Sequence, residues 1–171
     1  MSRKEPPSRM VLVECKPDER LIRLLGVPRS RIRHEGSKGD LCNRLRREEN
    51  HIAVIDKDPA SAQPSYLRNA RLIEENHGVR VLEDPQRGHR ILMLCPRLEG
   101  WILQVARRNG IRPEDHRLPP DEEKLHEEIN LRPQRFEDLI RGLLERKCPE
   151  LDYLRRWIRA GREGATGPRA L

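Results

Sequence analysis

The segment HIAVIDKDP, residues 51–59, decides the fold. Residues 52–55 form a short apolar run, which is typical of a strand that is buried on both faces. Pro59 has no backbone N–H to donate, so the strand should stop there. Asp56 and Asp58 stand at the carboxyl end of the run. We therefore expect a central strand that ends in carboxylates.

The flanking sequence alternates between strand and helix patterns. MVLVEC (10–15) is a second buried strand and RSRIRHEG (29–36) a weaker one, and the expected helices are KPDERLIRLLG (16–26), SKGDLCNRLRREEN (37–50) and SYLRNARLIEEN (65–76). Ser37 has the side chain of a helix N-cap, with Asp40 three residues later. This alternation predicts an α/β fold with a small, mostly parallel sheet and helices on both faces.

The second half of the chain is expected to be mainly helical. VRVLED (79–84) and HRILMLC (89–95) flank a turn, PQRG, and form a hairpin or strands at the sheet edge. Apolar stripes then predict helices within residues 96–110, 121–130, 133–147 and 149–160. The expected organisation is a flexible 1–9, an α/β core over 10–95, a helical C-terminal region over 96–160 and a disordered tail over 161–171. The helical region would cover the sheet, form a homodimer or bind a partner.

Composition limits the classes of partner. The 171 residues suit one compact domain with a modest core, since 37% of them are charged. A net charge of +7 favours polyanions such as nucleic acid, although arginine-rich chains also come from GC-rich or thermophilic genomes. Aromatic residues make up only 3%, which argues against a single-strand platform of stacked rings.

The cysteines and the hydropathy pattern point to a soluble cytoplasmic protein. Cys15, Cys42, Cys95 and Cys148 show neither CxxC spacing nor a histidine at zinc-ligand spacing, so we expect free thiols and no structural zinc. No apolar run has the length of a membrane span, and the first residues lack an apolar signal core.

Three acidic residues are expected to meet at one edge of the sheet. Glu14 nearly ends the first strand, and Asp56 and Asp58 end the third. In the common doubly wound order these two strands are neighbours, and ligands bind at their carboxyl ends. Crowded carboxylates repel one another unless a cation neutralises them or some of them are protonated, and Mg²⁺ accepts carboxylate, water and phosphate oxygens.

Each of these residues also has a structural interpretation. Glu14 alone would be an acid paired with one of the many arginines. The segment from Asp56 to Pro59 alone would be a turn. Asp18 suits the first turn of a helix, where acids complement the helix dipole. Asp84, which precedes a proline, is expected to be a turn residue. The conjunction of Glu14 with the two aspartates is what favours a metal site.

Two of these segments resemble the motifs of the Toprim family. VLVECKPDE resembles the first Toprim motif, an apolar strand followed by Glu, and IAVIDKDP resembles the second, the DxD strand. The resemblance covers about residues 10–95 and implies a Toprim-like, Rossmann-like sheet. It implies that Glu14 acts as general acid or base and that Asp56 and Asp58, with Glu14, hold Mg²⁺ or Mn²⁺. Cys15 departs from the usual glycine and would narrow the approach of a phosphate.

Two further segments are similar to small Toprim-like proteins of the OLD and RloB neighbourhood, many of them tied to phage defence. GSKGD (36–40) is similar to their Gly-Lys-Gly turn, which implies that Lys38 meets a phosphate at a helix N-terminus. PRLEGWIL (96–103) is similar to their Glu-x-Trp helix. Glu99 would then join Asp18 as an outer acid of the site. Alternatively, Lys38 is an exposed loop residue, and Glu99 caps a helix while Trp101 packs in the core.

The leading hypothesis is a Mg²⁺-dependent nuclease acting on DNA, RNA or a nucleotide. A topoisomerase would need a further domain with a nucleophilic tyrosine, and a primase would need a zinc module. The alternative is a non-catalytic Toprim-like module that binds nucleic acid or protein. A receiver-like domain with Asp56 as phosphoacceptor is disfavoured, because no adjacent acid pair follows the first strand.

Overall fold

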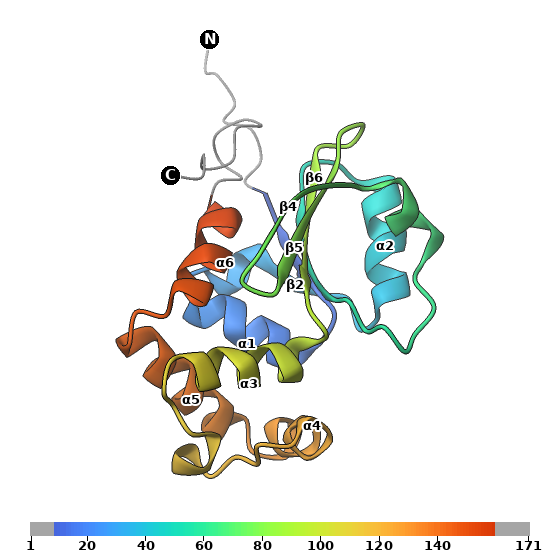
Figure 1. Ribbon diagram of the computed structural model, residues 1–171. Coiled ribbons are helices and arrows are strands. Elements are labelled where there is room, and N and C mark those ends of the chain that lie inside the picture. The colour runs from blue at the N-terminus through green and yellow to red at the C-terminus, as the bar shows by residue number, and fades with distance from the viewer. Residues whose placement is uncertain (1–8, 160–171) are drawn as a thin grey trace.

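The computed structural model describes residues 9–159, which form an α/β fold around one six-stranded sheet (Figure 1). The predicted features of residues 1–8 and 160–171 lie outside the described residues. The strands are β1 (Val11–Val13), β2 (Ile32–His34), β3 (Ile52–Asp56), β4 (Arg71–Asn76), β5 (Val79–Asp84) and β6 (His89–Leu94). The α-helices are α1 (Lys16–Leu24), α2 (Lys38–Arg47), α3 (Leu98–Arg108), α4 (Glu122–Leu131), α5 (Pro133–Glu145) and α6 (Pro149–Arg159). Short 3₁₀ helices are η1 (Arg29–Arg31), η2 (Ser65–Asn69) and η3 (Pro113–His116).

The strand order is β2-β1-β3-β6-β5-β4. Strands β2, β1, β3 and β6 pair in parallel, whereas β5 runs antiparallel to both β6 and β4. The predicted neighbours β1 and β3 do pair, with Val13 opposite Val54. Their carboxyl ends therefore meet at one edge of the sheet, next to the start of α3.

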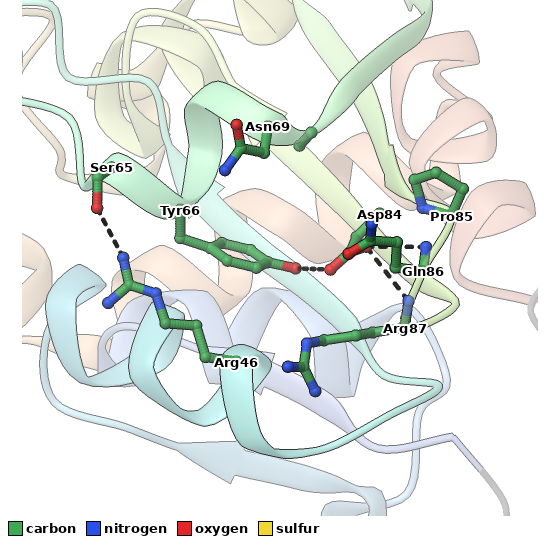
Figure 2. Close-up of a pocket in the computed structure, with 9 residues that line it drawn as sticks. Arg46, Ser65, Tyr66, Asn69, Asp84, Pro85, Gln86 and Arg87 are labelled. Atoms are coloured by element: carbon green, nitrogen blue, oxygen red, sulfur yellow. Dashed lines mark hydrogen bonds between the residues drawn. The ribbon is translucent and has the colours of Figure 1, made fainter.

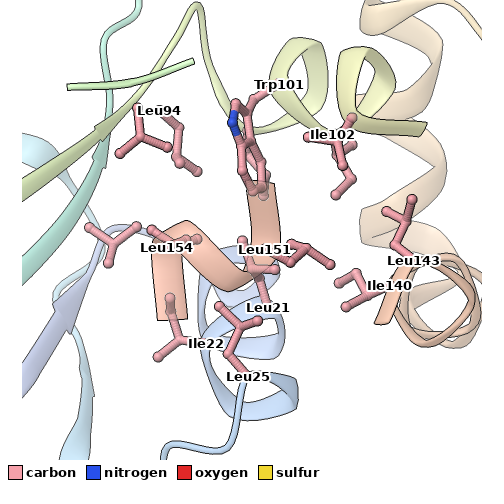
Figure 3. Close-up of a cluster of buried hydrophobic side chains, with 14 of the residues drawn as sticks. Leu21, Ile22, Leu25, Leu94, Trp101, Ile102, Ile140, Leu143, Leu151 and Leu154 are labelled. Carbon is pink, nitrogen blue, oxygen red and sulfur yellow. The ribbon is translucent and has the colours of Figure 1, made fainter. Parts of the chain in front are cut away.

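Helices cover both faces of the sheet, as the alternation predicted (Figure 1). On one face, α2 and η2 pack against Leu12, Ala53, Ile55 and Ile91. On the other face a larger core joins the sheet to α1, α3, α5 and α6, and it includes Leu21, Ile22, Leu94, Trp101, Ile140, Leu143, Leu151 and Leu154 (Figure 3). The C-terminal helices thus cover the sheet, and they share one core with residues 10–95.

The expected helix over residues 65–76 is wrong. Residues 65–69 form η2, and β4 follows as an edge strand paired with β5. His77 and Gly78 have φ of 52° and 73°, and they link the Asn76–Val79 pair as a two-residue turn. Positive φ at both central residues is the geometry that a tight hairpin needs. The hairpin prevails over the helix-forming side chains because the turn at His77 and Gly78 brings residues 71–76 back alongside β5, where they extend the sheet.

Of the two arrangements expected for residues 79–95, the hairpin is confirmed, but residues 89–94 do not lie at the sheet edge. Strands β5 and β6 do form the predicted hairpin, with four turn residues between the Asp84–His89 pair. However, β6 also pairs with β3 and lies inside the sheet, and all six of its residues are buried. Within residues 9–159, no helix combines the length and apolarity needed to cross a bilayer.

Candidate functional site at the carboxyl edge of the sheet

Glu14 and Asp56 meet where β1 and β3 end. The backbone N–H of Asp56 donates a hydrogen bond to Glu14 Oε1 over 3.2 Å. The parallel register of the two strands causes this meeting, because Val13, directly before Glu14, is opposite Val54, two residues before Asp56. The two residues that the strand patterns placed at the same edge are therefore adjacent.

Asp56 also holds the start of α3. Its Oδ1 accepts a hydrogen bond from the backbone N–H of Leu98 over 2.8 Å. Helix N-termini have unpaired N–H groups, and a carboxylate there is favoured by the helix dipole. Arg97 at the N-cap makes no capping bond of its own. The sequence gives no local sign of this long-range cap, since the two residues are 42 positions apart.

Asp58 is placed differently from the sequence expectation. Strand β3 ends at Asp56, and Asp58 has a φ of 45°, so the alternation of an extended chain does not continue to it. Its backbone N–H bonds to the carbonyl of Pro96, and its Oδ2 accepts the hydroxyl of Ser61 over 2.7 Å. Asp58 nevertheless lies near enough to Glu14 to raise the pKa of that carboxyl.

Asp18 belongs to the same group of acids. It lies in the first turn of α1 and is only 1% exposed. The Cys15 thiol donates to its Oδ2 over 3.0 Å, whereas its Oδ1 is buried without a hydrogen-bond partner. A buried oxygen of this kind is costly unless something binds it. Asp18 lies in the first turn of α1 as expected, but its burial was not foreseen from the sequence.

Cys15 does not need to be a glycine for the backbone to fold. It is the N-cap of α1, with φ of −140° and ψ of 169°, which any residue adopts. Its thiol is partly buried and turned toward Asp18. All four cysteines are free thiols, as predicted; Cys42 and Cys148 are buried, whereas Cys15 and Cys95 are partly exposed.

Glu99 is a buried carboxylate that pairs with a histidine, and its place as an outer acid of the site stays a prediction. It is 4% exposed in the first turn of α3, and its Oε1 contacts His126 Nδ1 of α4 over 2.7 Å. Its charge also raises the pKa of Asp56 and Asp18, so it faces the acidic group. Trp101 packs in the core and donates its indole N–H to the carbonyl of His77 over 2.9 Å.

Lys38 supplies the cation of the site. It begins α2 after Ser37, whose hydroxyl accepts the N–H of Asp40 as predicted. The ammonium of Lys38 lies 3.5 Å from the backbone carbonyl of Lys57. Lys57 is the residue between Asp56 and Asp58 in the sequence. Its charge lowers the otherwise raised pKa values of Glu14 and Asp56.

Crowding of these acids changes their ionisation. Burial, followed by the charges of Glu14 and Glu99, raises the pKa of Asp56 from 3.8 to about 7. Burial also raises the pKa of Glu14, and burial with the Asp56 charge raises that of Asp18 well above its ordinary value. The charges of Glu14 and Glu99 thus disfavour ionisation of both Asp56 and Asp18, so these four side chains lie within electrostatic reach; we call Glu14, Asp18, Asp56 and Glu99 the acidic cluster. A bound cation would relieve that repulsion.

The donor types of the acidic cluster fit a divalent cation, although no closed ligand set exists. Among residues 9–159, no three His, Cys, Asp or Glu side chains stand in positions that could hold a metal ion. Mg²⁺ is usually held by one or two carboxylates, with water and phosphate oxygens completing its shell. Glu14 and Asp56, which meet at the strand ends, are the two carboxylates that would hold it, with water and phosphate oxygens as the other ligands.

A cavity of about 490 Å³ lies elsewhere, at the amino ends of the strands (Figure 2). Arg46, from the end of α2, donates to the Ser65 hydroxyl over 2.7 Å. Tyr66 donates to Asp84 Oδ2 over 2.6 Å, and Asp84 Oδ1 accepts two backbone N–H groups of the β5–β6 turn. Asp84 is thus the predicted turn residue, and this cavity is separate from the acidic cluster.

Comparison of the chain with protein-family models, with curated proteins and with solved structures found no match in any of the three.

Proposed function

We propose that the acidic cluster carries out Mg²⁺- or Mn²⁺-dependent phosphodiester chemistry on nucleic acid, as a Toprim-like nuclease. The observation that supports this proposal best is the junction of Glu14 and Asp56 at the edge where doubly wound sheets bind ligands. The net charge of +7 suits a polyanionic substrate.

Each side chain has a role in this proposal. Asp56 and Glu14 would hold the cation, with Asp18 and Asp58 as nearby acids, and the cation when bound would supply charge stabilisation at a phosphoryl oxygen. Glu14 would exchange a proton at its carboxylate oxygen, and its raised pKa brings it closer to neutral pH. Lys38 would contact a substrate phosphate, since its ammonium lies beside the same edge.

The test is cleavage of single- and double-stranded DNA and RNA with Mg²⁺ or Mn²⁺. Asp56→Asn and Glu14→Gln variants should lose cleavage at least a hundredfold. An Asp138→Asn variant is the matched control, because Asp138 is exposed on α5, away from the cluster. Equal cleavage by wild type and the Asp56→Asn variant would reveal a contaminating nuclease and end the enzyme proposal.

A second candidate is a non-catalytic module that binds nucleic acid or protein. The observation in its favour is that Glu14 and Asp56 each already accept a backbone N–H, which is a structural use of a carboxylate. Calorimetric titration with Mg²⁺ separates the two candidates. The nuclease should bind Mg²⁺ and lose this binding in Asp56→Asn, whereas the module should show no heat of binding at this edge.

A further inference from the structure

The amino edge of the sheet holds a buried arginine whose charge is not balanced. Arg90 is the second residue of β6 and is 4% exposed, yet its Nε and Nη1 are buried without a hydrogen-bond partner in the described chain. Its guanidinium carbon lies 4.8 Å from the ring centre of Trp157 in α6. A cation–π contact offsets part of the cost of burying this charge but provides no hydrogen-bond acceptor.

A cavity of about 320 Å³ adjoins this arginine, and Arg9, Glu83, Pro85, Gly88, His89 and Arg90 line it. Liquid water occupies about 30 Å³ per molecule, so the space is roughly that of ten waters. Arg9 lies two residues before the start of β1 and also lines the cavity. Its guanidinium donates a hydrogen bond to the carbonyl of Gly88 over 3.2 Å. The cavity therefore has room for a small ion between two guanidinium groups.

The local charges leave a deficit of anions. Glu83 is the cross-strand partner of Arg90, so both side chains leave the sheet on the same face. No ion pair of Arg90 forms within residues 9–159, and Glu83 lies 3.5 Å from Arg71 instead. Burial lowers the pKa of Arg90 and the charge of Arg9 lowers it further, while the charge of Glu83 partly opposes this lowering. Three arginines thus surround one carboxylate.

We propose that this cavity, lined by Arg9 and Arg90, is a binding site for a phosphate group. Guanidinium groups present paired N–H donors that match phosphate oxygens, and the buried Nε and Nη1 of Arg90 lack acceptors. The site is distinct from the acidic cluster. Arg90 is opposite Ile52 of β3, and Ile52 lies four residues before Asp56. At about 3.3 Å per strand residue, Arg90 is therefore about 13 Å from Asp56 along the strand direction.

The test uses the full chain and inorganic phosphate, with chloride at matched ionic strength as the reference. Phosphate should raise the melting temperature saturably and change the tryptophan fluorescence, because Trp157 contacts Arg90. An Arg90→Met variant should bind phosphate at least tenfold more weakly. An Arg141→Met variant, which removes an equal charge from the exposed surface of α5, should bind like wild type.

Two further variants keep the result interpretable. Trp157→Phe should lose the fluorescence change but keep the thermal response to phosphate, since an aromatic face remains beside Arg90. Arg9→Ala should also weaken binding at least tenfold, which tests the site even where Arg90→Met fails to fold. No thermal response beyond that of chloride, or equal responses in wild type and Arg9→Ala, would overturn the proposal.

Separate titrations identify the source of the phosphate. Inorganic phosphate, a mononucleotide and a short DNA oligonucleotide each supply the group. If the oligonucleotide binds more tightly than inorganic phosphate and loses that advantage in Arg9→Ala and Arg90→Met, the site holds a nucleic-acid backbone. If the oligonucleotide binds no more tightly than inorganic phosphate or the mononucleotide, the site holds a small molecule. Both outcomes support the phosphate site. A failure to find nuclease cleavage at the acidic cluster would not change the interpretation of either outcome.

Discussion

Removing the charge of Asp56 should stabilise the protein at alkaline pH. An Asp56→Asn variant keeps a side-chain oxygen that can accept the Leu98 N–H, which now bonds to Asp56 over 2.8 Å. It removes the negative charge that burial and the charges of Glu14 and Glu99 disfavour. The variant therefore separates the helix-capping role of the residue from its place in the acidic cluster.

The magnitude follows from the pKa of Asp56. The pKa rises from 3.8 to about 7 on folding, so the folded state binds more protons than the unfolded state between these values. Stability due to this carboxyl is present below about pH 4 and is lost as the pH rises through 7. A shift of about 3 units at about 1.4 kcal/mol each sets a ceiling of about 4 kcal/mol. Because the side chain is partly exposed, we expect a gain of about 2–4 kcal/mol at pH 8.

Urea unfolding of the wild type and the variant at pH 4, 6 and 8 measures this gain. The difference should be near zero at pH 4, grow through pH 6 and reach its full value at pH 8. Asp138→Asn, at an exposed position of α5, should show no such growth. A loss of stability at pH 8, or a gain that does not vary with pH, would refute the proposed repulsion. Millimolar Mg²⁺ should stabilise the wild type at pH 8 and narrow the gap.

Three further changes test the fold. The stability advantage of wild type over a His89→Gln variant should be complete at pH 7.5 and shrink below about pH 6.5, because burial lowers the pKa of His89; urea midpoints at several pH values measure it. Gly78→Ala should cost at least about 2 kcal/mol in urea unfolding, since φ is +73° and the new Cβ would lie 2.9 Å from Trp101. Ser37→Ala should cost about 1 kcal/mol by loss of the Asp40 cap, and wild-type stability in this variant would contradict that role.

The parallel part of the fold could be predicted because its signals are local. The apolar runs of β1 and β3, and the N-cap Ser37 of α2, each lie within a few residues. Helix 65–76 was predicted wrongly because Leu, Arg, Ala and Glu all favour helices, while the deciding partner, β5, begins only at Val79. The sequence signal for this hairpin is Asn76-His77-Gly78, because asparagine and glycine favour the tight two-residue turn that the structure forms at His77 and Gly78.

The candidate site was predictable only in its strand-end residues. Glu14 and Asp56 follow from strand pairing, since neighbouring parallel strands end at the same edge. The burial of Asp18 and the bond from Leu98 to Asp56 depend on where α1 and α3 sit, and no sequence spacing encodes that. Asp58 does not point to the same side as Asp56 by strand alternation, as was predicted, because the strand ends at Asp56 and the chain turns there.

The shared core on the α1 face has a consequence for synthesis of the chain. Val11 and Val13, which are synthesised well before α6, are buried in the same cluster as Leu154 and Trp157 of that helix. While the ribosome is still translating the middle of the message, the exposed apolar side of the nascent sheet has no cover. The core on this face can be completed only after α6 has been synthesised. Until then, chaperones that bind exposed apolar segments could bind the uncovered strands.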